Sequence, residues 1–114
     1  MLDPLIHQAA RLRIMAALQR NREARFTALR DALGLTDGNL ASHAAVLEKA
    51  GYVEARRVLT TGGFELRYRI TPRGAAAFLA YVGELKALLE SPPDVVSAGP
   101  DAPSPAGAGS RPAG

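Results

Sequence analysis

Apolar residues recur along the first 90 positions with two different periods. Up to residue 50 they return every three or four positions, which is typical of amphipathic helices. This spacing predicts helices over about 3–20, 27–33 and 36–50. Over 52–59 and 64–70 the period shortens to two, which predicts two strands around a turn at Thr60-Thr61-Gly62-Gly63. A final helical pattern over about 71–90 then predicts a fourth helix.

Residues at the predicted ends of the helices fit known capping preferences. Asp3-Pro4 and Thr71-Pro72 each place a capping side chain before a proline at the first helical position. Gly34 should end the second helix, because glycine enters the left-handed conformation at little cost. Either Thr36 or Asp37 can cap the third helix through a side-chain oxygen.

The third predicted helix has two contrasting faces. Its apolar face carries Leu40, Ala44 and Leu47. The opposite face carries small or hydrogen-bonding residues: Gly38, Ser42, Ala45 and Lys49, flanked by Asn39 and Val46. A helix of this kind, supported by a preceding short helix, is typical of the helix-turn-helix motif, and a hairpin directly after it is typical of a wing. We therefore predict a mostly α, α+β winged helix-turn-helix with the order helix-helix-helix-strand-strand-helix.

The chain divides into two regions. Residues 1–90 form one predicted domain, for DNA binding and dimerisation. From Ser91 to residue 114 the sequence is rich in Pro, Gly, Ala and Ser and has almost nothing to bury, so it cannot offset its ordering entropy. We expect a disordered tail there.

Charge and composition narrow the function. The chain has 114 residues and a net charge of +3, and 13 of its 14 basic residues lie in the first 90 positions. A basic domain suits an anionic partner. Cysteine is absent, which excludes disulfides, thiolate metal sites and cysteine nucleophiles. No apolar run reaches membrane-spanning length and no secretory signal is visible, so we expect no membrane partner and a cytoplasmic location.

The sequence offers no catalytic or metal-binding pattern. His7 and His43 fall on different predicted helices, without metal-ligand spacing. The side chains of Ser42 and His43 diverge, because neighbours on a helix do not face each other. Gly62-Gly63 is a hairpin tip and not a phosphate-binding loop. We predict that the protein is not an enzyme and uses no metal or cofactor.

Three segments carry a resemblance to a known group, at residues 2–18, 26–53 and 68–78. Together with the intervening residues, they make about 80% of the chain resemble the compact, single-domain winged-helix transcriptional regulators related to the MarR and ArsR groups. The resemblance implies a homodimeric repressor or activator that binds double-stranded DNA. Two features depart from the family pattern: the wing tip is neutral, and Ala44 stands where relatives often have Leu.

The candidate DNA contacts fall into two sets. The base-reading candidates are Gly38, Asn39, Ser42 and His43. The phosphate-contact candidates are Arg25, Arg30, Lys49, Arg56, Arg57, Arg67, Arg69 and Arg73. Alternatives remain open for both sets: Asn39 could serve as a local cap, His43 could pack against the core, and any single cation could be a solvated charge.

The first and last helices carry more apolar surface than a small monomer needs. The last helix has an apolar stripe of Ala75, Phe78, Leu79, Val82, Leu85, Leu88 and Leu89. This excess predicts packing against a second copy, and the alternative is burial within one protomer. The dimerisation candidates are Leu2, Leu5, Ile6, Phe78, Val82, Leu85 and Leu89. A cleft between such helices could also hold an unknown apolar small-molecule effector.

A second function remains open on the sequence. The neutral wing tip, together with Ala41, Ala44 and Ala45 on the third helix, offers few base-reading groups. A winged-helix module for protein-protein interaction is therefore the alternative to a DNA-binding regulator.

Overall fold

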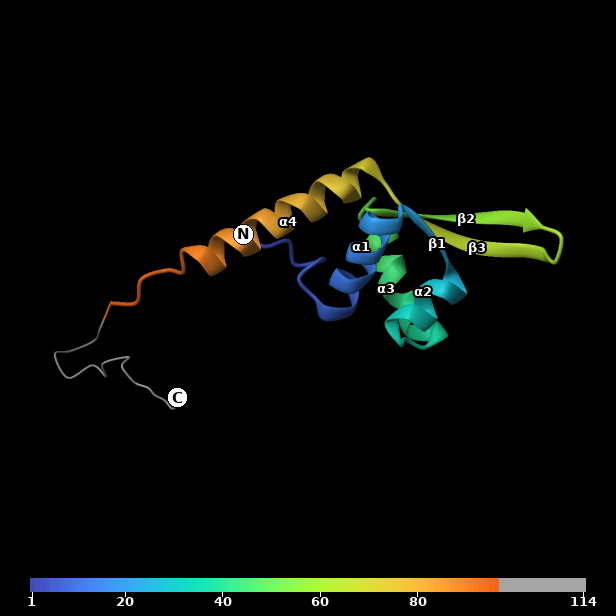
Figure 1. The fold of residues 1–114 in the computed structure, drawn as a ribbon, viewed down its shortest axis with the longest axis horizontal. Helices are drawn as coiled ribbons and strands as arrows, with labels where there is room; N and C mark the ends of the chain where they lie inside the picture. Colours follow the sequence, from blue (N-terminus) through green and yellow to red (C-terminus); the bar gives the residue numbers. More distant parts are fainter. Residues whose placement is uncertain (97–114) are drawn as a thin grey trace.

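The computed structural model describes residues 1–96, which form four helices and three strands (Figure 1). In chain order these are α1 (Ala9–Asn21), β1 (Glu23–Arg25), α2 (Phe26–Leu33), α3 (Asp37–Lys49), β2 (Val53–Thr60), β3 (Gly63–Ile70) and α4 (Pro72–Glu90). The predicted winged helix-turn-helix is confirmed, with one strand more than the sequence indicated.

The additional strand, β1, lies between the first two helices, where the sequence pattern predicted no strand. The three strands form an antiparallel sheet in the order β1-β3-β2. Glu23 lies opposite Arg69, and Ala24 lies opposite Tyr68. A three-residue strand has too few positions to show an alternating pattern, and its partner lies more than 40 residues away, so no local signal marked it.

The predicted start of the first helix at Asp3 is also wrong, because α1 begins at Ala9. The Asp3 carboxylate instead accepts a hydrogen bond from the Leu5 amide at 2.9 Å, which stabilises a separate turn. Gln8 caps α1 by accepting from the Arg11 amide at 2.9 Å. This turn brings Ile6 into the interior, where its side chain has no exposed surface.

The helix-turn-helix ends are close to those predicted. Gly34 ends α2 with φ +66°, in the left-handed region where a side chain would be strained. Thr36, not Asp37, caps α3, accepting from the Asn39 amide at 3.1 Å. Thr71 caps α4 in the same way and Pro72 follows it, as expected.

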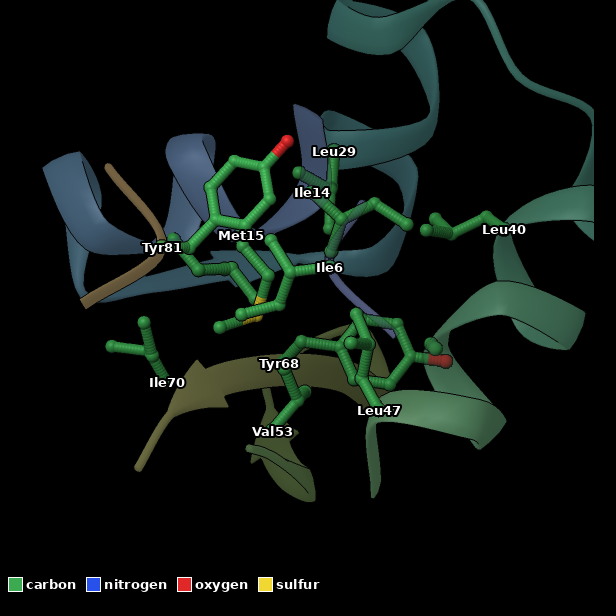
Figure 2. Packing of buried hydrophobic residues seen from close by; sticks show 12 residues of the cluster. Ile6, Ile14, Met15, Leu29, Leu40, Leu47, Val53, Tyr68, Ile70 and Tyr81 are labelled. Atoms are coloured by element: carbon green, nitrogen blue, oxygen red, sulfur yellow. The ribbon is translucent and has the colours of Figure 1, made fainter. Parts of the chain in front are cut away.

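The core lies between the four helices and the sheet, and it also includes Ile6 of the N-terminal segment (Figure 2). Leu40, Ala44 and Leu47 of α3 are fully buried, which confirms the predicted apolar face of this helix. The buried cluster comprises Ile6, Ile14, Met15, Leu18, Leu29, Leu40, Ala44, Leu47, Val53, Tyr68, Ile70 and Tyr81. Burying one Leu or Ile side chain stabilises a fold by roughly 1.5–3 kcal/mol. The burial of Leu40 and Leu47 therefore holds α3 in place within the compact body that surrounds this cluster.

α4 and the β2–β3 hairpin project in opposite directions from this body (Figure 1). Only Gly74 and Tyr81 are buried on α4, and most of its second half is exposed. Residues 91–96 are exposed and form no helix or strand, and the rest of the predicted tail lies outside the described residues. Within residues 1–96 no helix is long and apolar enough to cross a membrane.

Candidate nucleic-acid interface

The outward face of α3 presents the predicted base-reading residues. Gly38, Asn39 and Ser42 are exposed. The Asn39 backbone amide is occupied by the cap bond to Thr36, but within residues 1–96 its carboxamide makes no hydrogen bond. The side chain of Asn39 is therefore available to an external partner, and the alternative in which that side chain serves as a cap is not observed.

His43 occupies a different environment, half-buried beside α1. Nη1 of Arg11 lies 3.2 Å from Nδ1 of His43. A guanidinium can only donate, so Nδ1 accepts and the proton of the neutral ring lies on Nε2. Nε of Arg11 also donates to the Leu5 carbonyl oxygen at 2.6 Å. Arg11 thus links His43 to α1 and to the N-terminal segment. The Nε2–H group of His43 is its remaining hydrogen-bond donor.

Arg30 joins the two helices of the helix-turn-helix. Its Nε donates to Asp31 and its Nη1 donates to Asp37 of α3, each at 2.8 Å. The hydrogen bond to Asp31, with a second to Asp37, raises the pKa of Arg30, and the same contact lowers the pKa of Asp31. The positive charge of Arg30 is therefore paired with the carboxylates of Asp31 and Asp37.

The outer face of the sheet alternates arginines and glutamates. Glu23 accepts from Arg56 at 2.6 Å and from Arg67 at 3.2 Å, so it connects β1 to both other strands. Arg67 also donates to Glu65 at 2.7 Å, and Arg69 pairs with Glu54. The bond from Arg67 lowers the pKa of Glu23, and the bond to Glu65 raises that of Arg67. These three arginines are all engaged within the sheet.

The remaining phosphate-contact candidates form fewer ion pairs with carboxylates of the protein. Arg25 lies 3.9 Å from Glu65, at the limit of an ion pair. Among residues 1–96, no carboxylate lies within 4.0 Å of Lys49, Arg57 or Arg73. Arg57 instead lies over the Phe64 ring, 5.0 Å from its centroid. The predicted phosphate contacts therefore fall into two groups. Some are paired with a carboxylate within the protein, whereas Lys49, Arg57 and Arg73 have no such pair among residues 1–96.

A second surface lies on α4 and the N-terminal segment. Of the dimerisation candidates, Val82 and Leu89 are exposed, and Leu2, Leu5, Phe78 and Leu85 are half-buried. Ile6 is wrong as an interface residue, since it is fully buried in the protomer core. Leu79 and Leu88 are exposed although the dimerisation set omitted them. Their signal was present in the apolar stripe of the last helix.

A hollow of about 540 Å³ adjoins this second surface. It is lined by Met1, Leu2, Glu84, Ala87, Leu88 and Ser91. The N-terminal amine forms an ion pair with Glu84 at 2.8 Å at its edge. The hollow therefore lies between the start of the chain and the second half of α4.

Each of the two histidines contacts a polar side chain from another part of the chain. His7 Nδ1 lies 2.6 Å from the Tyr81 hydroxyl oxygen, and His43 is bound to Arg11. Within residues 1–96, no three His, Cys, Asp or Glu side chains gather as a metal site would require.

The comparisons with known proteins agree with this geometry. The family model for the winged helix DNA-binding domain matches residues 10–89, and the chain belongs to this family. The chain is 33% identical over 81 residues to an uncharacterised protein of Methanocaldococcus jannaschii, covering 71% of this chain and 88% of that protein.

The fold is similar to those of several solved structures. A transcriptional regulator homologue from Pyrococcus horikoshii OT3 matches with a TM-score of 0.73 and 32% identity, over 75% of this chain and 85% of that one. The homodimeric winged helix-turn-helix DNA-binding domain of a Mycobacterium bovis protein matches with a TM-score of 0.64 and 26% identity, over 75% and 76% of the two chains. The resemblance to winged-helix regulators of the MarR and ArsR type is confirmed.

Proposed function

We propose that this protein is a sequence-specific, double-stranded-DNA-binding transcriptional regulator that acts as a homodimer. In this proposal α3 lies in the major groove and the β2–β3 hairpin is the wing. The observation that carries it is the exposed face of α3, where the Asn39 carboxamide and the Ser42 hydroxyl face solvent. The role is one of binding and not of catalysis, and it belongs in the cytoplasm.

The base-reading roles follow from the donor and acceptor chemistry of these side chains. Asn39 can pair bidentately with adenine, and Ser42 can bond to a base edge or a phosphate. His43 offers Nε2–H as a donor to a base or phosphate acceptor at the edge of the same face. Gly38 permits close approach of the backbone, since nothing lies within 4 Å of the place where a Cβ would stand.

The phosphate contacts come first from the cations that no carboxylate engages. Lys49, Arg57 and Arg73 supply three such charges per protomer. In a dimer, six contacts give a slope of log K against log salt of roughly −5. Arg30, Arg56, Arg67 and Arg69 must share their charge with a carboxylate, and Arg25 does so at longer range.

The dimer proposal is supported by the apolar surface of α4. Leu79, Val82 and Leu89 are 60%, 42% and 73% exposed. Their spacing of three and seven residues places them along one side of the helix. The M. bovis relative is homodimeric, which supports the same assembly here. An apolar effector could occupy the hollow beside Leu88, which opens onto this surface.

The test is a fluorescence-anisotropy titration on DNA from the protein's own upstream region and on scrambled DNA, each at two salt concentrations. We expect a preference for the upstream DNA that Asn39→Ala and Ser42→Ala reduce, whereas Lys49→Ala weakens binding to both DNAs. Arg20→Ala, in the exposed last turn of α1 and outside both candidate sets, is the matched control for loss of a cation. Weak and equal binding to both DNAs would instead favour the protein-interaction module.

The homodimer is tested separately by sedimentation of the wild type and of Leu79→Glu. A charge placed on an apolar interface should give a monomer with unchanged far-ultraviolet circular dichroism. A wild type that sediments as a monomer at all concentrations would contradict the dimer.

A further inference from the structure

The wing contains an arginine that is held by an aromatic ring and not by a carboxylate. The guanidinium carbon of Arg57 lies 5.0 Å from the centroid of the Phe64 ring. This is within the range of a cation–π interaction, which orients the guanidinium without neutralising its charge. The ring itself is 65% exposed, so the pair is open to a partner.

The register of the hairpin explains why this arginine differs from its neighbours. Arg57 lies opposite Leu66, and Leu59 lies opposite Phe64. Because side chains alternate between faces, these four share the face that carries Tyr68 further along β3. The glutamates of the sheet, Glu23, Glu54 and Glu65, occupy the opposite face with Arg56, Arg67 and Arg69.

The pair has a large apolar neighbour. Leu59 is 70% exposed beside Phe64, close to the neutral tip at residues 60–63. A hollow of about 310 Å³ adjoins Phe64 and is lined by Arg25, Phe26, Thr27, Phe64, Glu65 and Leu66. Phe64 and Leu59 beside an oriented cation suit a partner that presents CH groups next to anionic groups. The deoxyribose-phosphate backbone of DNA is such a partner.

We propose that Arg57, Phe64 and Leu59 form the DNA-contacting element of the wing. Arg57 binds a backbone phosphate beside the groove that α3 occupies, Phe64 is a positioning residue that orients its guanidinium, and Leu59 packs on the adjoining deoxyribose. The proposal rests on the DNA-binding function proposed above. The tip of this wing, at residues 60–63, carries no charge. In the proposed element, Arg57 supplies the cation three residues before the tip.

The test measures affinity and its salt dependence for the full chain on the upstream DNA. Phe64→Leu keeps an apolar side chain but removes the ring, and we expect about two- to fivefold weaker binding, as a cation–π contact is worth. Arg57→Ala should weaken binding to all sequences and reduce the salt slope by about one per protomer. Leu59→Ala should lower affinity while leaving the slope unchanged.

The positioning role is tested with double variants. In the Arg57→Ala background, Phe64→Leu should have no further effect, and Phe64→Tyr alone should bind like the wild type because it keeps a ring. Arg20→Ala, in the exposed last turn of α1 and outside the set of DNA-contact candidates, is the matched control and should leave the slope unchanged. Thermal melting of each variant verifies that it is folded.

Two outcomes would contradict the proposed DNA-contacting element of the wing. One is wild-type affinity and slope for both Arg57→Ala and Phe64→Leu on DNA that the wild type binds. The other is a Phe64→Leu loss that is equally large with and without Arg57. Failure of the wild-type protein to bind DNA would refute the underlying function instead, so the two failures are distinguishable.

Discussion

The first turn of α4 lies directly against the backbone at Tyr52, with Gly74 at the contact. A Cβ on Gly74 would lie 2.1 Å from the Tyr52 carbonyl oxygen and 2.8 Å from its carbonyl carbon. The same carbonyl oxygen accepts a hydrogen bond from the Thr71 amide at 3.0 Å. The Thr71 hydroxyl donates to the Gly51 carbonyl oxygen at 2.5 Å. This junction fixes where α4 begins relative to the end of α3.

We therefore expect Gly74→Ala to destabilise the fold by at least about 1–3 kcal/mol, because the added methyl meets backbone that cannot rotate away. Thermal unfolding followed by circular dichroism measures the loss. Gly83→Ala is the matched control on the same helix, since nothing lies within 4 Å of its Cβ position. That variant should be more stable by up to about 1 kcal/mol, as alanine favours helix. Equal melting temperatures for the two variants would contradict the contact.

The cap of α3 gives a second prediction, at two neighbouring residues that the sequence left as alternatives. Thr36→Ala removes the acceptor of the Asn39 amide and should cost about 0.5–2 kcal/mol. Asp37→Ala leaves this cap intact and removes an exposed contact with Arg30 and a negative charge in the first turn of α3, so its cost should be smaller. Urea unfolding of both variants compares them, and a larger loss for Asp37→Ala would contradict the assignment of the cap.

Glu23 gives a prediction about acid stability. Its pKa is lowered in the folded state, chiefly by the hydrogen bond from Arg67. A carboxyl with a depressed pKa stabilises the fold above its unfolded pKa of about 4.3 and loses this contribution as the pH falls through the folded value. The stability of the wild type should therefore fall more steeply below pH 4.3 than that of Glu23→Gln.

Urea unfolding at several pH values tests this expectation. Glu90→Gln, at the exposed end of α4, is the matched control for loss of one carboxylate. The difference between Glu23→Gln and the wild type should be largest near neutral pH and shrink in acid. A difference that stays constant from pH 7 to pH 2 would show that Glu23 contributes no pH-dependent stability.

The sequence predicted the elements whose signals are local. Gly34, Thr71 and the face formed by Leu40, Ala44 and Leu47 acted as expected, because caps and helical periodicity depend on residues within two turns of each other. The Asp3-Pro4 signal was misleading, because the same carboxylate can stabilise a turn as easily as a helix.

The site was predictable only in part. The exposure of Asn39 and Ser42 follows from their position on α3, and the structure agrees. The engagement of Arg56 and Arg67 by Glu23 could not be predicted, since it depends on β1 and on the register of three strands. For the same reason, the placement of Arg57 over Phe64 becomes visible only once the hairpin register is known.

Tyr52 gives the last prediction, at the other end of the pH range. Its hydroxyl donates to Oδ2 of Asp3 at 2.5 Å, which ties the N-terminal segment to the junction between α3 and β2. This hydrogen bond, with burial as the second cause, raises the pKa of Tyr52. A group with a raised folded pKa stabilises the fold below its unfolded pKa, near 10, and the contribution disappears as the pH rises through the folded value.

We expect Tyr52→Phe to cost about 1–3 kcal/mol at neutral pH, because the Asp3 carboxylate loses its donor. The cost should shrink as the pH rises from about 10 through the raised pKa of the folded state, because the wild-type hydroxyl then ionises and stops donating. Urea unfolding between pH 7 and pH 11 measures this convergence, and absorbance at 295 nm follows the tyrosines directly. Asp3→Asn, which removes the charge but keeps an acceptor, should let Tyr52 ionise at lower pH. An unchanged tyrosine titration in Asp3→Asn would show that the carboxylate does not raise this pKa.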